Sequence, residues 1–126
     1  MVHERGATLA LVAGVVGALA VAAGAFGAHG LRYSVDAHAL EIWHTAARYH
    51  LVHTVVLLAL AANARATQRR VTVAFAVLLG GLAVFSGSLY VLVLTGQRWL
   101  GAVTPLGGLA LIAGWVLAGL ALARRD

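Results

Sequence analysis

Four long stretches of the chain, at residues 7–28, 42–64, 71–94 and 105–123, are dominated by Ala, Leu, Val and Gly. The hydrocarbon core of a bilayer is about 30 Å thick and a helix rises about 1.5 Å per residue, so a spanning helix needs about 20 mainly apolar residues. Each stretch is close to that length. The sequence therefore predicts an all-α integral membrane protein, a four-helix bundle in which residues 1–126 form a single domain.

The composition agrees with a surface covered by lipid. Hydrophobic residues make up 62% of the chain and charged residues 10%, whereas a soluble domain has about 25% charged residues. All nine basic residues are Arg, and they lie in short segments between the apolar stretches. This distribution favours topology signals over a nucleic-acid surface, so we expect membrane lipids and no nucleic acid among the partners. The absence of Cys excludes thiol chemistry, thiolate metal sites and disulfides.

The first stretch has two interpretations. Arg5 precedes it and small residues end it, as in a signal peptide. However, the apolar core of a signal peptide is only about 7–15 residues long. The stretch from Ala7 to Ala28 is longer, which favours a helix that is retained.

The ends of the later helices carry their own signals. The strictly apolar part of the second stretch, residues 51–62, is too short to span, so that helix must begin near Ile42, and Ser34 or Asp36 could cap a preceding helical stretch. Thr104 followed by Pro105 predicts an N-cap and first helical residue for the fourth helix. Residues 96–103 would then form a short loop.

Four spans place both termini on one side of the membrane, and the Arg distribution predicts which side. Trp43 and Trp99 fall at the opposite boundary, as in an interfacial aromatic belt. We therefore expect both termini in the cytoplasm and the protein in the inner or plasma membrane. The termini side would carry Arg5, Arg65, Arg69, Arg70, Arg124 and Arg125, and the other side Arg32, Arg48 and Arg98.

Small residues recur at helical spacing and predict close helix packing, since small side chains let backbones approach in lipid. The alternative is that a chain with 15 Gly makes such pairs by chance. The pairs and series are Gly14, Gly17, Gly24 and Gly27 in the first stretch, Ala83 and Gly87 in the third, and Gly107 and Gly114 in the fourth.

A polar stripe follows one side of the second helix. At 100° per residue, His38, Glu41, Thr45, Arg48 and Tyr49 share a face, which His53 borders, while Trp43 and His50 point the opposite way. Ionisable groups within a span cost about 2.5–3.5 kcal/mol on insertion scales and normally face a bundle interior or water. The stripe could form a polar pocket with Arg48 as an anion or lipid-headgroup contact. Alternatively, Arg48 snorkels to the headgroups and Glu41 pairs with a nearby His.

The remaining polar residues favour a role without catalysis or a metal. Six His are present, but no HExxH or other compact ligand motif occurs. Haem ligation would need facing His on two helices, and His29 with His53 is the plausible pair. Ser86 and Ser88 lie in no GxSxG setting. We expect no catalytic residues, no metal site and no cofactor.

Four segments resemble a known family. They are GAFGAHGL at 24–31, WHTAARYH at 43–50 followed by His53, FSGSLY at 85–90 with LTG at 94–96, and LGAVTPLGG at 100–108. In order, they are similar to the YgdD family of small multi-pass inner-membrane proteins, a domain-of-unknown-function family with eukaryotic relatives. The resemblance covers nearly the whole chain and implies no established activity. One departure is His50, where the family pattern has Gln.

The resemblance assigns the family's motif positions to residues that lie toward the outer half of the expected bundle. Those positions are His29, Thr45, Arg48, Tyr49, His53, Ser86, Gly87, Ser88, Tyr90, Thr104 and Pro105. At similar depth from all four helices, His29, Arg48, Tyr49, Ser88, Tyr90 and Thr104 predict one shared polar core. The candidate polar-core or binding residues are His29, Glu41, Thr45, Arg48, Tyr49, His53, Ser86, Ser88, Tyr90 and Thr104.

Three functional classes remain open, in this order of preference. The first is a structural or accessory protein with a membrane-protein partner or a second copy of itself. The second is a protein that binds or transports a small molecule, ion or lipid through the polar core. The third is a metal- or haem-dependent redox protein.

Overall fold

The computed structural model describes residues 2–64 and 69–124, and within them the chain is helical, with no strand. The elements are α1 (Val2–His29), the 3₁₀ turn η1 (Leu31–Tyr33), α2 (Ala37–Ala62), α3 (Arg69–Thr95) and α4 (Leu100–Ala123). All four α-helices are long and apolar enough to cross a membrane. The predicted all-α, four-helix membrane architecture is confirmed.

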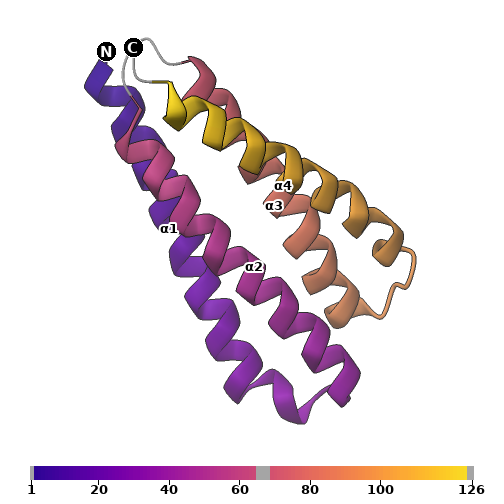
Figure 1. The fold of residues 1–126 in the computed structure, drawn as a ribbon. Helices are drawn as coiled ribbons and strands as arrows, with labels where there is room; N and C mark the ends of the chain where they lie inside the picture. The colour runs from indigo at the N-terminus through magenta and orange to yellow at the C-terminus, as the bar shows by residue number, and fades with distance from the viewer. Residues whose placement is uncertain (1, 65–68, 125–126) are drawn as a thin grey trace.

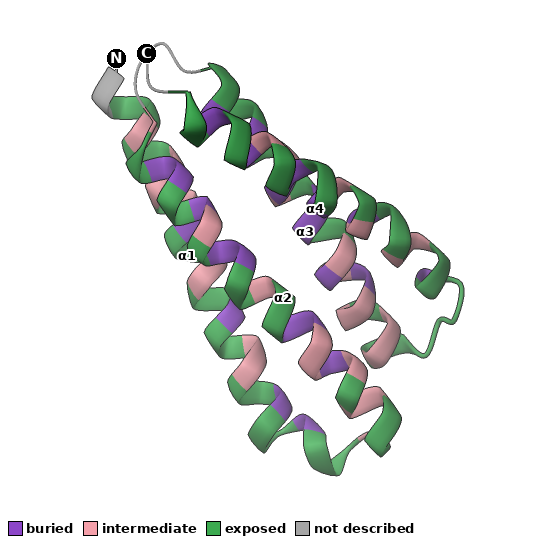
Figure 2. Ribbon diagram, in the orientation of Figure 1, coloured by how far each residue is buried: buried purple, intermediate pink, exposed green. Residues whose placement is uncertain are grey.

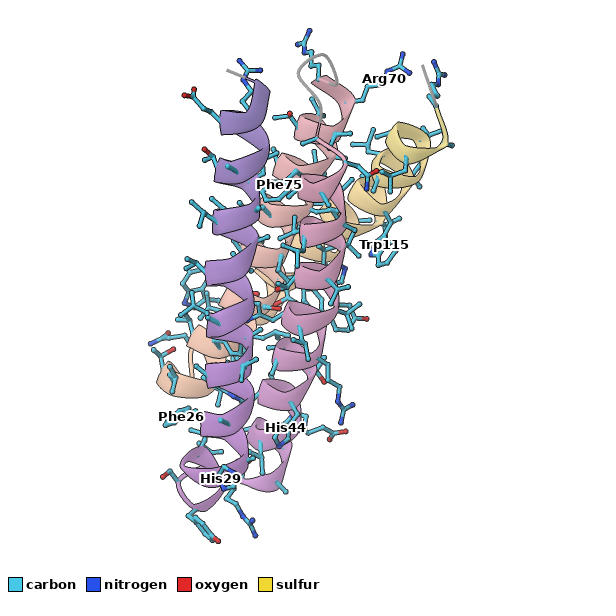
Figure 3. The ribbon with its side chains drawn as sticks, turned by 90° about the vertical axis from the view of Figure 1, so that its left-hand side faces the viewer. Phe26, His29, His44, Arg70, Phe75 and Trp115 are labelled. Atoms are coloured by element: carbon cyan, nitrogen blue, oxygen red, sulfur yellow. The ribbon has the colours of Figure 1, made fainter. Side chains whose placement is uncertain are left out.

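The helices form two antiparallel hairpins. α1 packs along α2, α3 packs along α4, and the hairpins meet where α2 packs on α3 (Figure 1). α1 makes no comparable contact with α3 or α4 in the described part of the chain. The two ends of the chain lie at the same end of the molecule, as four spans require (Figure 1). Arg70 marks that end and His29 the opposite end (Figure 3).

The apolar core occupies the half of the molecule nearer the termini. Leu57 and Leu60 of α2 are fully buried against Val71 and Leu78 of α3. Figure 2 shows buried positions concentrated where helices face one another, while many outward positions are exposed. In lipid these outward apolar side chains cost nothing, so packing and hydrogen bonds hold the helices together.

Glycine allows the closest helix contacts. A Cβ added to Gly107 would lie 2.4 Å from the Phe85 backbone nitrogen, and one added to Gly114 would lie 2.6 Å from the Leu78 side chain. On the α1–α2 side, a Cβ on Gly17 would meet Thr54 at 2.9 Å. The small-residue packing prediction is therefore confirmed at these three positions.

The other glycines of the predicted series do not all make close contacts. Gly27 does, because a Cβ added there would lie 2.6 Å from the Trp43 side chain. In contrast, nothing lies within 4 Å of a Cβ added to Gly14, Gly24 or Gly87. Their sides of α1 and α3 have no packed neighbour, so the spacing there reflects composition and not contact.

The helix ends confirm one prediction and correct another. Asp36 caps α2, accepting a 2.8 Å hydrogen bond from the Ala39 N–H. The predicted start of α4 at Thr104 was wrong, because the helix begins at Leu100 and contains Pro105. A turn of i to i−3 hydrogen bonds, such as Leu100 N–H to the Gln97 carbonyl, starts it earlier. The Thr104 hydroxyl is then free to contact α3 instead of capping.

Trp43 is also placed differently from the interfacial belt that the sequence predicts. Its side chain is 5% exposed and packs between helices, with the indole N–H donating to the Ala23 carbonyl of α1 at 2.8 Å. Trp99, at 64% exposed, faces outward as expected. An indole inside the bundle needs an acceptor, and the α1 carbonyl supplies one.

Candidate functional site

A layer of polar and aromatic side chains lies beyond the apolar core, in the half of the molecule away from the termini. Ser86 of α3 donates a 2.9 Å hydrogen bond to the Ala46 carbonyl of α2. Ser88 of α3 and Thr104 of α4 share a 2.6 Å hydrogen bond between their hydroxyls. These bonds tie α3 to both of its neighbours, where hydrogen bonding between helices is a main source of cohesion in lipid.

His53 joins α2 to α4. The indole N–H of Trp115 donates to His53 Nε2 at 3.0 Å, and His53 Nδ1 lies 2.6 Å from the Tyr49 carbonyl. Because an indole nitrogen can only donate, Nε2 must be unprotonated, and the proton then sits on Nδ1 and is donated to the carbonyl. His53 is thus a neutral, 4% exposed side chain with both ring nitrogens engaged. Figure 3 shows Trp115 on α4.

Both ring nitrogens of His53 already have hydrogen-bond partners, which makes it a poor candidate for haem ligation. A metal at His53 would have to displace either Trp115 or the carbonyl contact. The other proposed ligand, His29, is exposed at the end of α1. Within residues 2–64 and 69–124, no group of three or more His, Cys, Asp or Glu side chains is placed to hold a metal ion.

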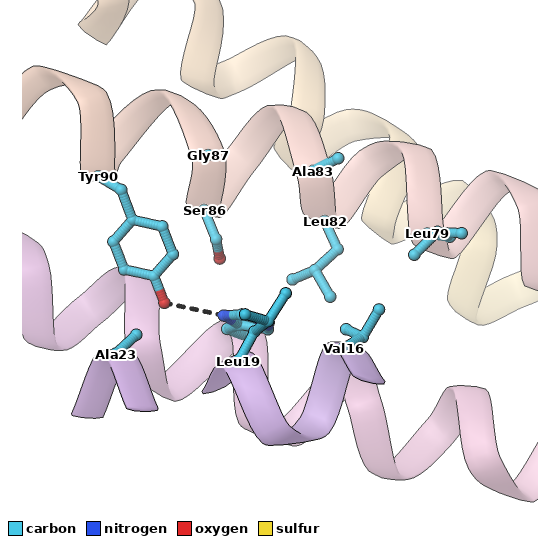
Figure 4. Close-up of a pocket in the computed structure, with 10 residues that line it drawn as sticks. Val16, Leu19, Ala23, Leu79, Leu82, Ala83, Ser86, Gly87 and Tyr90 are labelled. Atoms are coloured by element: carbon cyan, nitrogen blue, oxygen red, sulfur yellow. Dashed lines mark hydrogen bonds between the residues drawn. The ribbon is translucent and has the colours of Figure 1, made fainter. Parts of the chain in front are cut away.

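A cavity of about 480 Å³ lies on the other side of α2, between α1 and α3 (Figure 4). The space exists because α1 and α3 do not pack on each other, and its walls are mostly aliphatic. At one end, His50 Nδ1 and the Tyr90 hydroxyl form a 2.9 Å hydrogen bond (Figure 4). The lining includes Val16, Leu19 and Ala23 of α1, His50 of α2, and Leu82, Ser86, Gly87 and Tyr90 of α3.

The His50–Tyr90 pair keeps unused hydrogen-bonding capacity in either tautomer. If Tyr90 donates to Nδ1, the phenol oxygen can still accept from another molecule. If Nδ1 carries the proton, the phenol O–H is free to donate. Trp43 packs on the Tyr90 ring with centroids 4.5 Å apart, which limits its movement. The pair therefore presents a fixed polar group at the end of an apolar space.

The structure divides the sequence-predicted residues into two groups. Tyr49 stacks on His53 with ring centroids 5.7 Å apart, although its side chain is 44% exposed. Thr45 is half-buried. The residues that take part in the interhelical hydrogen bonds are His53, Ser86, Ser88, Tyr90 and Thr104, and the exposed ones are His29, Glu41, Arg48 and Tyr49.

The predicted single core with a side chain from every helix is not what forms. Glu41 and Arg48 lie on the outward side of α2, and within the described residues α1 adds no polar side chain to the layer, although its Ala23 carbonyl accepts from Trp43. The reason is that α2 packs through the opposite side, the one that carries Trp43 and His50. The polar stripe on α2 thus points out of the four-helix unit.

Three residues of this layer are not among the predicted site residues: His50, Trp43 and Trp115. The resemblance implies Gln at the position of His50, and Gln and His can both hydrogen-bond a phenol. The available signal was its position on one helical face with Trp43, Thr54 and Leu57. Trp115 had no local signal, since its partner lies 62 positions away in the chain.

Comparison with known proteins places the chain in a family. A match to the family described as "Protein of unknown function (DUF423)" covers residues 23–108. The chain belongs to the DUF423 family. It is 40% identical over 110 residues to a UPF0382 membrane protein of Staphylococcus aureus, covering 86% of this chain and 90% of that protein.

A second relative gives the same result. The UPF0382 membrane protein YwdK of Bacillus subtilis is 42% identical over 110 residues, which is 85% of this chain and 89% of YwdK. No solved structure matches. With four helices able to span a membrane, this DUF423 protein is a multi-pass membrane protein. The family match includes His50, Ser86 and Tyr90 but begins at Ala23, beyond the other α1 residues that line the cavity.

Proposed function

We propose that this DUF423 protein, a YgdD-type protein of the inner or plasma membrane, binds a small lipophilic molecule that carries one polar group. The observation that carries the proposal is the cavity between α1 and α3, with aliphatic walls and the His50–Tyr90 pair at one end. Binding sites of this kind are mainly apolar, with a few polar groups that fix orientation.

The cavity limits the size and chemistry of the ligand. At roughly 30 Å³ per water-sized group, a space of about 480 Å³ holds on the order of 15 non-hydrogen atoms. That is enough for one hydroxyl or carbonyl group and a short apolar body, and any longer chain would extend from the cavity into the lipid. Because α1 and α3 do not pack on each other, such a molecule can enter sideways from the lipid.

Native mass spectrometry of the gently extracted protein, combined with lipid analysis, tests this proposal. Gly87 lines the cavity and has open space around it, so Gly87→Leu adds volume there without a backbone clash. Gly80 on the same helix also has open space but does not line the cavity, so Gly80→Leu is the matched control. We expect wild type and Gly80→Leu to carry a bound lipophilic molecule and Gly87→Leu to lose it. A bare protein in all three, or the same adduct in all three, would contradict the proposal.

A structural or accessory role is the second candidate, with another membrane protein or a second copy as partner. It is favoured by the complete pairing of the interior: within the described residues, every buried side-chain nitrogen and oxygen has a hydrogen-bond partner. Such a polar layer stabilises the bundle by itself. Under this role the cavity is a packing gap, and the bare-protein outcome above supports it.

The proposal also includes the orientation, with both termini in the cytoplasm. Arg5, Arg69, Arg70 and Arg124 all lie toward the end that holds the termini, and Arg32 and Arg98 toward the other. Positively charged segments stay in the cytoplasm. A C-terminal green fluorescent protein fusion is expected to fluoresce and a C-terminal alkaline phosphatase fusion to be inactive. Active phosphatase at the C-terminus would reverse the orientation.

A further inference from the structure

Arg48 is the only Asp, Glu, Lys or Arg within the four apolar stretches that span the membrane. Its depth follows from its neighbours. The adjacent Tyr49 ring lies 4.5 Å from the Phe85 ring, and Ala46 accepts the hydrogen bond from Ser86. Arg48 is thus level with the region around Phe85, from which α3 continues for about 15 Å to Thr95. Arg48 therefore lies inside the stretch 42–64 and nearer its outer end, about 9 Å along the helix from Ile42.

The direction of Arg48 makes this depth unusual. α2 buries Trp43, Ala47, Thr54 and Leu57 against its neighbours, whereas Arg48 is exposed on the opposite side. A charge within a span normally faces the bundle interior or a water-filled cavity. Here Arg48 faces away from the four-helix unit. Contact of its charged guanidinium with the hydrocarbon of the bilayer would be energetically unfavourable.

The outward side of α2 changes character at Arg48. Toward the termini it is apolar and exposed, with Leu51, Val52 and Val55 each 49% exposed or more. In the other direction it is polar, with Glu41 exposed and Thr45 half-buried. The apolar part, residues 51–62, is only about 18 Å long, well short of the roughly 30 Å hydrocarbon core. A short apolar surface thins the bilayer next to it.

We propose that Arg48 binds the phosphate of an anionic phospholipid from the leaflet opposite the termini, drawn inward along the polar half of α2. Thinning brings the headgroup layer toward Arg48, and the long Arg side chain extends to meet it. The planar guanidinium binds phosphate oxygens in pairs, which a compact ammonium does not. The site is separate from the cavity, which lies on the other side of α2 and is lined by His50.

Two observations favour a lipid over a second copy of the chain. The close helix contacts in this protein use glycine, as at Gly17, Gly81 and Gly107, whereas α2 contains no glycine. A two-fold pairing of the outward sides of α2 would also bring Arg48 beside its own copy at the same depth, and like charges repel there. A lipid phosphate supplies the opposite charge at a surface that is otherwise suited to lipid.

The test uses the full chain in vesicles of equal parts phosphatidylglycerol and phosphatidylcholine, followed by native mass spectrometry. We expect wild type to retain phosphatidylglycerol over phosphatidylcholine, and Arg48→Gln to reduce that retention by about tenfold, since the charge-assisted hydrogen bonds to the phosphate are lost. Arg98→Gln, an exposed Arg in the α3–α4 loop, is the matched control and should resemble wild type. Arg48→Lys should retain an amount between wild type and Arg48→Gln, because Lys keeps the positive charge but cannot bind two phosphate oxygens in the paired geometry of a guanidinium.

Three outcomes would overturn the proposal: equal phosphatidylglycerol retention in Arg48→Gln and wild type, no preference over phosphatidylcholine, or a wild-type dimer that Arg48→Gln dissociates. The last would assign Arg48 to a protein interface. Gly87→Leu should keep its phosphatidylglycerol, so failure of the cavity proposal and failure of this one give different results. If Arg48→Gln does not fold, Arg48→Lys alone must still lower retention.

Discussion

Replacing Gly107 by leucine is expected to force α3 and α4 apart and to cost about 3 kcal/mol or more in the free energy of unfolding. Even a single Cβ at this position would lie 2.4 Å from the Phe85 nitrogen and 2.9 Å from the Gly81 carbonyl oxygen. These are backbone atoms, so no side-chain rotation can relieve the contact. Overpacking typically costs about 1–3 kcal/mol, and a rigid backbone neighbour places this case at or above the upper end. Titration of the folded fraction with sodium dodecyl sulphate in mixed micelles measures the loss.

The matched control is Gly119→Leu on the same helix, where nothing lies within 4 Å of an added Cβ. It makes the same chemical change and should shift the unfolding midpoint little. A similar loss in both variants would show that α4 does not approach α3 as closely as the structure has it. Gly107→Ala should lie between the two, because it adds only the Cβ.

Replacing His53 by leucine is expected to destabilise the bundle by about 1–3 kcal/mol. Leucine fills a similar volume but leaves the Trp115 indole N–H without its 3.0 Å acceptor and the Tyr49 carbonyl without its second donor. Within the hydrocarbon region of a membrane, water does not replace either bond. The same detergent titration measures the change, and His38→Leu, at an exposed position of α2, is the control.

A double-mutant cycle isolates the bond between α2 and α4. Trp115→Phe removes the donor, and adding it to His53→Leu should cost less than the sum of the two single changes. Interhelical hydrogen bonds in membrane proteins average about 0.6 kcal/mol and reach about 1.7 kcal/mol, so the coupling should fall in that range. Additive effects would mean that the histidine and the indole act independently.

The number, approximate position and direction of the helices could be predicted from the sequence. Each apolar stretch had to be a helix, since hydrocarbon offers no partner for backbone N–H and C=O groups. Asp36 marked the start of α2 because its side chain satisfies a free N–H of the first turn. The start of α4 could not be read locally, since the Thr104 hydroxyl bonds Ser88 of another helix.

The sequence predicted part of the candidate site. It did not predict which side chains of α2 face into the bundle and which face outward. The sequence predicts Ser86, Ser88 and Tyr90 as polar-core residues, and all three take part in hydrogen bonds between helices. For Arg48 the sequence leaves a polar pocket and a headgroup contact as alternatives, and in the structure this side chain faces outward, while His50 faces the cavity.

The sequence by itself determined that this protein is four membrane-spanning helices with both ends on one side, because the length of apolar runs is set by the bilayer. Only the tertiary structure decided which side of α2 turns inward. In water, a helix reveals its packed side by the contrast between apolar and polar residues. In lipid, the surroundings are as apolar as the core, so that contrast disappears and packing shape alone selects the side.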